Sequence, residues 1–231
     1  MNSEDFENIL IQQKKSFIVK ISNLNKVFLI DEKRYEVNLM PFRNFSLIKK
    51  VEKEAKEFLK NNKIPENLKI KYIKEPKEKI FFKIDIKAAY WYAAGKLFLT
   101  KKTFEEGLKG RYSKLNRLIA LGSLASRNII KIYEKGNLIT ETIEKKETEK
   151  LYFYIASNID LIMSLSGGGY WVDCAFLKEK EEFCELLESL NYLYSVEKIY
   201  SFKKNKNIYE INNKIYNFED DLNLNNYGKS Y

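Results

Sequence analysis

The chain has 231 residues, of which 45% are hydrophobic and 32% are charged, and its formal net charge is +9. This hydrophobic fraction can fill a core, whereas the many charges and the lack of a bilayer-length apolar run argue against a membrane protein. The sequence contains no histidine, which excludes Ser-His triads, histidine acid–base catalysis and nearly every zinc site. The acidic, polar N-terminus does not resemble a secretory signal, so we expect an intracellular, cytoplasmic protein.

Cys174 and Cys184 are the only cysteines. Without an oxidising context, two such residues are more typical of buried thiols than of a disulfide. Any bound metal is therefore expected to be a hard cation held by carboxylates, Mg²⁺ or Mn²⁺.

The first predicted domain covers residues 1–78 and consists of short strands and one amphipathic helix. Between residues 45 and 59 the apolar positions recur with a period near 3.6, which predicts a helix with a solvated, mixed-charge face. The other predicted elements are a short helix at 6–13 and strands at 17–21, 27–30, 34–39 and 68–73.

The second predicted domain covers residues 79–218 and is followed by a polar tail at 219–231. Two of its apolar strands each carry one carboxylate, Asp85 near the end of the strand at 80–86 and Asp173 after the glycines that end a long helix. The other predicted elements are a helix from residue 88 to Gly95, a tight connection at 103–110, helices at 113–127, 145–165 and 179–190, a hairpin at 129–142, and strands at 192–202 and 208–218. Gly122 inside a predicted helix indicates close packing at that position.

Basic residues dominate the segment from Lys87 to Lys131, where only Glu105 and Glu106 oppose them. Solvated helix faces usually mix both signs of charge, so this segment is predicted to face phosphates. The candidate nucleic-acid-binding residues are Lys101, Lys102, Lys109 and Arg127.

Three stretches, in this order, resemble the palm of family B DNA polymerases. The first motif of that family is an Asp at a strand end with a Tyr five residues later, and Asp85 and Tyr90 match it. The second is a helix with a Lys eight residues before a Gly, matched by Lys114 and Gly122. The third is an Asp-x-Asp hairpin after a long helix, and Asp173 falls where its second Asp belongs.

The resemblance implies an α/β (α+β) fold with a polymerase-palm-like antiparallel sheet packed by helices and an N-terminal β-rich extension. It implies that Asp85 and Asp173 are catalytic and hold Mg²⁺ or Mn²⁺ for nucleotidyl transfer on nucleic acid, DNA above all. Tyr90 would lie beneath the sugar, and the basic side chains would neutralise the transferring phosphate. The nucleotide-binding residues that it implies are Tyr90, Lys114, Arg111 and Arg117.

Two functions of different classes stay open. One is a minimal DNA polymerase or nucleotidyltransferase of a phage or mobile element, active in the host cytoplasm without a membrane partner, with a partner protein that supplies missing polymerase parts. The other is a catalytically inactive palm-like scaffold that serves as a nucleic-acid-binding accessory or virion structural protein. Trp171, which stands where the first Asp of the third motif belongs, favours the scaffold. Taken singly, Asp85 also fits a helix N-cap and Tyr90 a core residue.

Overall fold

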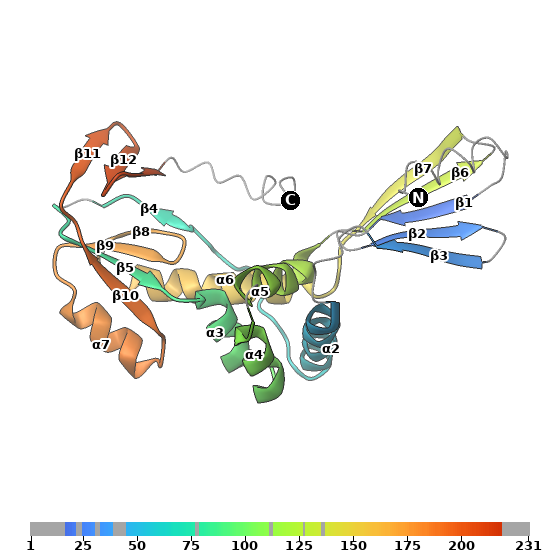
Figure 1. The fold of residues 1–231 in the computed structure, drawn as a ribbon, viewed down its shortest axis with the longest axis horizontal. Helices are drawn as coiled ribbons and strands as arrows, with labels where there is room; N and C mark the ends of the chain where they lie inside the picture. Colours follow the sequence, from blue (N-terminus) through green and yellow to red (C-terminus); the bar gives the residue numbers. More distant parts are fainter. Residues whose placement is uncertain are drawn as a thin grey trace. The chain divides into compact units, whose positions relative to one another are not determined.

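The structure, a computed structural model drawn in Figure 1, describes residues 17–21, 25–30, 33–38, 45–76, 79–110, 113–126, 128–134 and 137–218. Helices are combined with antiparallel sheets, which confirms the predicted α+β class. The predicted helix at 6–13 and the tail at 219–231 lie outside the described residues. Within the described parts of the chain, every helix is too short or too polar to cross a bilayer.

The chain forms two compact units, and each unit is assembled from two separate stretches. The first unit contains Met1–Lys63 and Lys102–Tyr152, and the second contains Ile64–Lys101 and Phe153–Tyr231. These units differ from the predicted ranges 1–78 and 79–218. Residues 102–152 belong to the first unit although they interrupt the second unit in the chain, and sequence patterns within one segment do not reveal such an interruption.

The first unit contains a five-stranded antiparallel sheet. Its strands are β1 (Phe17–Ile21), β2 (Asn25–Ile30), β3 (Lys33–Asn38), β6 (Asn128–Glu134) and β7 (Asn137–Glu144). The strand order is β3-β2-β1-β6-β7, so the hairpin β6–β7 pairs with a strand that is more than a hundred residues earlier. The three N-terminal strands and this hairpin confirm the predictions, with ends shifted by a few residues.

The helices of the first unit are α2 (Phe45–Asn61), α4 (Lys101–Leu108), α5 (Ser113–Gly122) and the short 3-10 helix η1 (Ser123–Ala125). The predicted apolar face of α2 is buried, since Leu47, Val51 and Ala55 are at most 1% exposed. Its polar residues bind the neighbouring segments. The contacts are Lys50–Glu106 at 2.5 Å, Lys146–Glu52 at 2.5 Å and Thr103 Oγ1 to Glu54 Oε1 at 2.6 Å.

Three predictions for this region are wrong. Residues 103–110 do not form a tight connection, because the chain is helical in α4 up to Leu108. The helix predicted at 113–127 ends at Gly122, where the chain tightens into η1, and Ser126 is already extended. An added Cβ on Gly122 would find no heavy atom within 4 Å, so nothing packs closely there.

The second unit contains another five-stranded antiparallel sheet, in the order β10-β5-β9-β8-β4. Its strands are β4 (Ile73–Lys74), β5 (Phe82–Ile86), β8 (Gly169–Trp171), β9 (Cys174–Leu177) and β10 (Tyr194–Lys198). The helix α6 (Glu149–Ser164) precedes β8, and α7 (Glu181–Ser189) joins β9 to β10. The sequence β5-α6-β8-β9-α7-β10 with this strand order is a ferredoxin-like split β-α-β arrangement. The short helix α3 (Ala89–Leu97), which passes through the predicted stop at Gly95, follows β5 directly.

The region after α7 differs from the two predicted long strands. It forms β10 and then a three-stranded sheet of β11 (Phe202–Asn205), β12 (Ile208–Ile211) and β13 (Lys214–Asn217). The turns contain Lys206, Asn212 and Asn213 with positive φ, a conformation that ends a strand. The strand predicted at 68–73 is absent except for Ile73, because the Lys71 and Tyr72 N–H groups bond to the Asp160 carboxylate at 3.2 and 2.9 Å.

Different layers cover the two faces of the second unit's main sheet. Tyr170 lies on the helical side, where its hydroxyl donates to Asp160 of α6 at 3.1 Å. The opposite side carries Cys174 and Phe176, which are buried under the three-stranded sheet. Figure 1 shows α7 on one side of the main sheet and β11 and β12 on the other. The buried cluster between the sheets consists of Ile73, Ile80, Cys174, Phe176, Tyr209, Ile211, Tyr216 and Phe218.

Two glycines are expected to respond to alanine in opposite ways. A Cβ on Gly169 would collide with the backbone nitrogen and Cα of Pro76, so Gly169→Ala should lower the free energy of unfolding by about 2–3 kcal/mol. Gly122→Ala should raise it by about 0.5–1 kcal/mol, because the site is open and helical. Urea titrations of both variants, followed by circular dichroism, measure the two shifts. A destabilised Gly122→Ala would contradict the open environment.

Candidate functional site

The two predicted catalytic carboxylates lie on adjacent segments of the second unit. Asp85 is in β5 and is paired with Cys174 of β9, and Asp173 is in the turn directly before Cys174. The Ile86 N–H donates to the Asp173 carbonyl at 3.1 Å. The register of β5 and β9 therefore brings together two acidic residues that are far apart in the chain.

Asp85 has no capping role for the helix that follows it. The N-cap of α3 is Ala88, with φ of 51° and no capping side chain. Asp85 instead lies within the ladder, where Cys174 and Ser195 pair with it from the two sides, and its side chain is half-buried. Tyr90 is also half-buried, in the first turn of α3. The two neighbouring strands, β9 and β10, therefore restrain the backbone of Asp85.

Cys174 directly follows Asp173, is paired with Asp85 in the β5–β9 ladder and is 5% exposed. Burial is the main cause that raises the pKa of its thiol to about 12, and Lys83 acts against it while the negative charges of Asp85, Asp173 and Glu197 act in the same direction as burial. The thiol therefore stays protonated at neutral pH. Both carboxylates lie near enough to this sulfur to act on it electrostatically.

The two cysteines are expected to differ in reactivity. Both thiols are free, Cys174 is buried, and Cys184 on α7 is half-exposed. Since a thiol reacts as its accessible thiolate, we expect Cys184 to react with a chromogenic disulfide reagent in the folded protein and Cys174 only after unfolding. Cys184→Ser should remove the fast reaction and Cys174→Ser should retain it. Equal native rates for both thiols would contradict this burial.

A salt bridge occupies the same sheet face as Asp85. Lys83, two residues before Asp85, donates to Glu197 Oε2 at 2.9 Å. Burial is the largest single influence and lowers the pKa of Lys83, but the hydrogen bond to Glu197 and the charge interactions with Cys174, Tyr216 and Glu197 together outweigh burial, so the net shift is upward. Asn212 donates to Glu197 Oε1 at 2.8 Å and, with Lys83, lowers the pKa of that carboxyl. Lys83 and Glu197 therefore stay charged and paired at neutral pH.

Sequence reasoning missed Lys83, Glu197 and Asn212. Lys83 could have been placed on the face of Asp85 from strand alternation alone. The pairing of Lys83 with Glu197 depends on the β5–β10 register, and the position of Asn212 depends on a turn that the sequence did not reveal.

Trp171 lies near this face and is engaged with the three-stranded sheet. Its ring is 5.8 Å from the Tyr216 ring in an edge arrangement, and its indole N–H donates to the Asn217 carbonyl at 3.3 Å. Trp171 thus helps to attach β13 to the main sheet.

The residues fit a hard divalent cation in chemical type. Asp85 and Asp173 supply carboxylate oxygens, the ligands that Mg²⁺ prefers, and Mg²⁺ commonly uses only one or two carboxylates and completes its shell with water and phosphate. Among the described residues there is no group of three or more acidic or thiol side chains arranged for a metal.

The predicted basic residues belong mainly to the first unit. Lys101, Lys102, Lys109 and Lys114 are exposed on or beside α4 and α5. Arg117 is half-buried and donates to the Gly107 carbonyl at 3.0 Å, so its guanidinium also holds α4 to α5. Arg111 and Arg127 lie outside the described residues.

The basic segment from Lys87 to Lys131 is divided between the two units, and some of its lysines have partners within the chain. Lys87 and Lys96 belong to the second unit, and the Lys96 ammonium lies 3.6 Å from the centroid of the Tyr192 ring and donates to the Leu190 carbonyl. Lys131 forms a salt bridge with Glu141 at 3.2 Å.

Comparison with protein families, with curated proteins and with solved structures gives no match to this chain. The structure brings Asp85 and Asp173 together in the second unit, to which Tyr90 also belongs, whereas Lys114 and Arg117 belong to the first. The candidate site is therefore defined by the end of β5 and the turn between β8 and β9.

Proposed function

We propose that the second unit is a palm-like, metal-dependent nucleotidyltransferase that acts on nucleic acid, with Asp85 and Asp173 as its catalytic carboxylates. The observation that carries the proposal is the adjacency of their segments, with the Ile86 N–H bonded to the Asp173 carbonyl at 3.1 Å. The hairpin that carries Asp173 also follows the long helix α6, in agreement with the order of the third family B polymerase motif.

In this proposal the residues of the chain mainly hold the metal and orient the nucleotide. Asp85 and Asp173 would hold Mg²⁺ or Mn²⁺, which in such sites activates an attacking hydroxyl and neutralises charge on the transferring phosphate. β5 and β9 are interior strands of the sheet, so each is restrained by hydrogen bonds on both sides. Tyr90, at the start of the helix after β5, is the candidate for contact beneath the sugar of the nucleotide.

The nucleic-acid partner is supported by the first unit taken by itself. Exposed ammonium groups on α4 and α5 are suited to phosphate contacts, which dominate the affinity of proteins for nucleic acids. We expect DNA as the partner. In this unit the residues that would make these contacts are Lys102, Lys109 and Lys114.

A second candidate, an inactive palm-like scaffold, is favoured by one observation. Trp171 fills the position of the missing motif carboxylate and is bound to Tyr216 and Asn217. A metal pair would then have one carboxylate fewer than in the family motif. In this case the chain would bind nucleic acid as a replication accessory or form part of a virion.

The experiment that separates the two candidates is nucleotide incorporation by the full chain. Labelled deoxynucleotides are offered with primed DNA, primed RNA and unprimed templates, in Mg²⁺, in Mn²⁺ and in excess chelator. Incorporation that needs the metal supports the transferase. If no template and metal combination yields product while the chain still binds nucleic acid, the scaffold is the correct function.

A further inference from the structure

Three lysine–aromatic pairs gather at one end of the main sheet of the second unit. The Lys79 ammonium is 5.3 Å from the Phe81 ring centroid, the Lys180 ammonium is 5.5 Å from that of Phe82, and the Lys198 ammonium is 6.0 Å from that of Tyr200. We call these six residues the lysine–aromatic rim.

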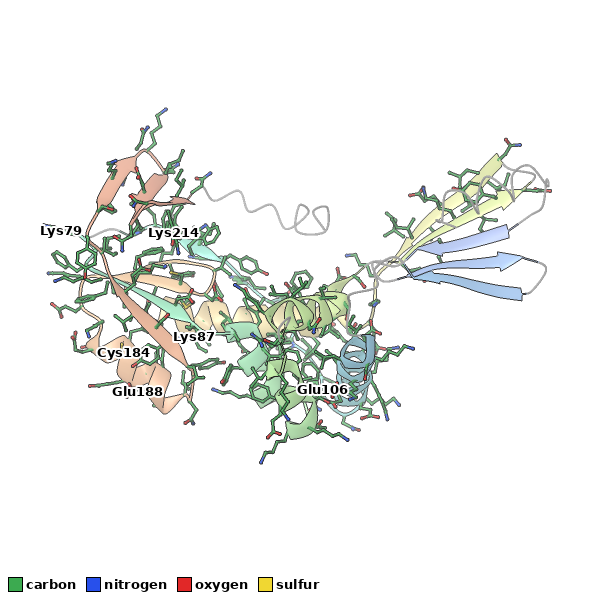
Figure 2. All side chains as sticks on the ribbon, in the orientation of Figure 1. Lys79, Lys87, Glu106, Cys184, Glu188 and Lys214 are labelled. Atoms are coloured by element: carbon green, nitrogen blue, oxygen red, sulfur yellow. The ribbon has the colours of Figure 1, made fainter. Side chains whose placement is uncertain are left out.

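Backbone pairing brings the three segments of the rim together. The Phe81 N–H donates to the Leu177 carbonyl and the Ile199 N–H to the Phe81 carbonyl, both at 2.8 Å, and Lys198 is paired with Phe82. The start of β5 and the ends of β9 and β10 therefore meet at this edge. Lys79 and Lys87, labelled in Figure 2, lie beyond the two ends of β5, and the rim is at the Lys79 end. Asp173 is at the other end, where its carbonyl accepts the Ile86 N–H.

Two rings of the rim are exposed to solvent, in contrast to the aromatic rings of the core of the unit. Tyr200 is 83% exposed and Phe81 is 38% exposed, whereas Tyr170 and Tyr209 are 1% exposed. A ring left in water on the surface of a folded unit is available to stack against a planar partner.

The charges of the rim are positive and outside the described salt bridges. In the second unit those salt bridges involve Lys83, Lys203 and Lys204, and none of the three rim lysines. The nearby carboxylates are Glu179, Glu181 and Glu182, and that of Glu181 accepts the Lys180 N–H at 3.0 Å. This N–H and the helix N-terminus partly satisfy the Glu181 charge.

We infer that the lysine–aromatic rim is a binding site for single-stranded nucleic acid, with bases stacked on Tyr200 and Phe81 and phosphates beside Lys79, Lys180 and Lys198. Rings and ammonium groups gathered at one edge fit a strand whose bases present flat faces and whose backbone is anionic. A duplex hides those faces in its stack, and an anionic peptide offers no regular series of planar groups. Binding here requires no metal, so it is independent of the reaction proposed at Asp85 and Asp173.

The test measures the binding of a fluorescent oligo(dT) of about 16 nucleotides to the full chain by anisotropy, in chelator so that no transfer can occur. Tyr200→Leu should weaken binding about 10-fold, and Tyr200→Phe should bind like wild type because the stacking ring remains. Replacing Lys79, Lys180 and Lys198 together by Gln should reduce the slope of log affinity against log salt by about 2. The charge-matched control replaces three exposed lysines outside the rim, Lys69, Lys71 and Lys206, by Gln.

The outcomes distinguish strand binding at the rim from general charge attraction and from a membrane contact. A rim triple variant that behaves like the control triple, or a Tyr200→Leu variant with wild-type affinity, would overturn the proposal. Vesicles of phosphatidylcholine and phosphatidylserine form the second arm. If the rim variants lose vesicle binding while oligo(dT) binding is unchanged, the rim is a membrane contact and the inference is wrong. Failure of nucleotide incorporation by the wild-type chain would not affect this result, because the binding is measured in chelator.

Discussion

Asp85→Asn is expected to lower metal-dependent nucleotide incorporation by at least about 100-fold, and Asp173→Asn by a similar factor. Asn matches Asp in size, so the β5 ladder that pairs Asp85 with Cys174 should be retained. The amide oxygen carries no full charge and is a poor ligand for a hard cation. Single-turnover incorporation at saturating Mg²⁺ measures the effect on the chemical step.

The control for the Asp85 experiment is Glu179→Gln, which removes one exposed carboxylate from the same unit. It should incorporate nucleotides at the wild-type rate. The double variant Asp85→Asn with Asp173→Asn should be little worse than either single variant, because residues that act as one unit are strongly non-additive. Incorporation by Asp85→Asn within a few-fold of wild type would exclude Asp85 as a metal ligand.

Asp160→Ala should lower the free energy of unfolding of the second unit by about 3–5 kcal/mol. Asp160 is 9% exposed, and its carboxylate accepts three hydrogen bonds, from the Lys71 and Tyr72 N–H groups and from the Tyr170 hydroxyl. Alanine would leave these donors without their acceptor in a mostly buried site. The segment before β4 would also lose its attachment to α6.

Tryptophan fluorescence reports this change selectively, because the two tryptophans of the chain, Trp91 and Trp171, both belong to the second unit. Tyr170→Phe is the graded comparison, since it removes one of the three hydrogen bonds and should cost about 1 kcal/mol. An Asp160→Ala variant that unfolds in urea with the wild-type midpoint would show that Asp160 does not anchor the segment at Lys71 and Tyr72.

Local patterns in the sequence were sufficient for most elements. The helical period predicted α2 within two residues at its C-terminal end, and apolar runs bounded by turn residues predicted β1, β5 and the β6–β7 hairpin. The predictions failed where the end of an element depends on a residue far away in the chain. The segment at 68–73 has strand-like apolar residues, but its N–H groups bond to Asp160 and not to a neighbouring strand.

The sequence alone determined which kinds of side chain are available to the candidate site. The absence of histidine, together with the two strand-associated carboxylates Asp85 and Asp173, directed the prediction toward a hard cation and away from zinc or triad chemistry. Only the tertiary structure decided that β5 and β9 are neighbours, that Lys83 and Glu197 are paired beside Asp85, and that Trp171 is engaged with β13. The physical reason is that periodicity reports which side of an element is buried, whereas strand order and register depend on contacts between segments that the chain itself keeps far apart.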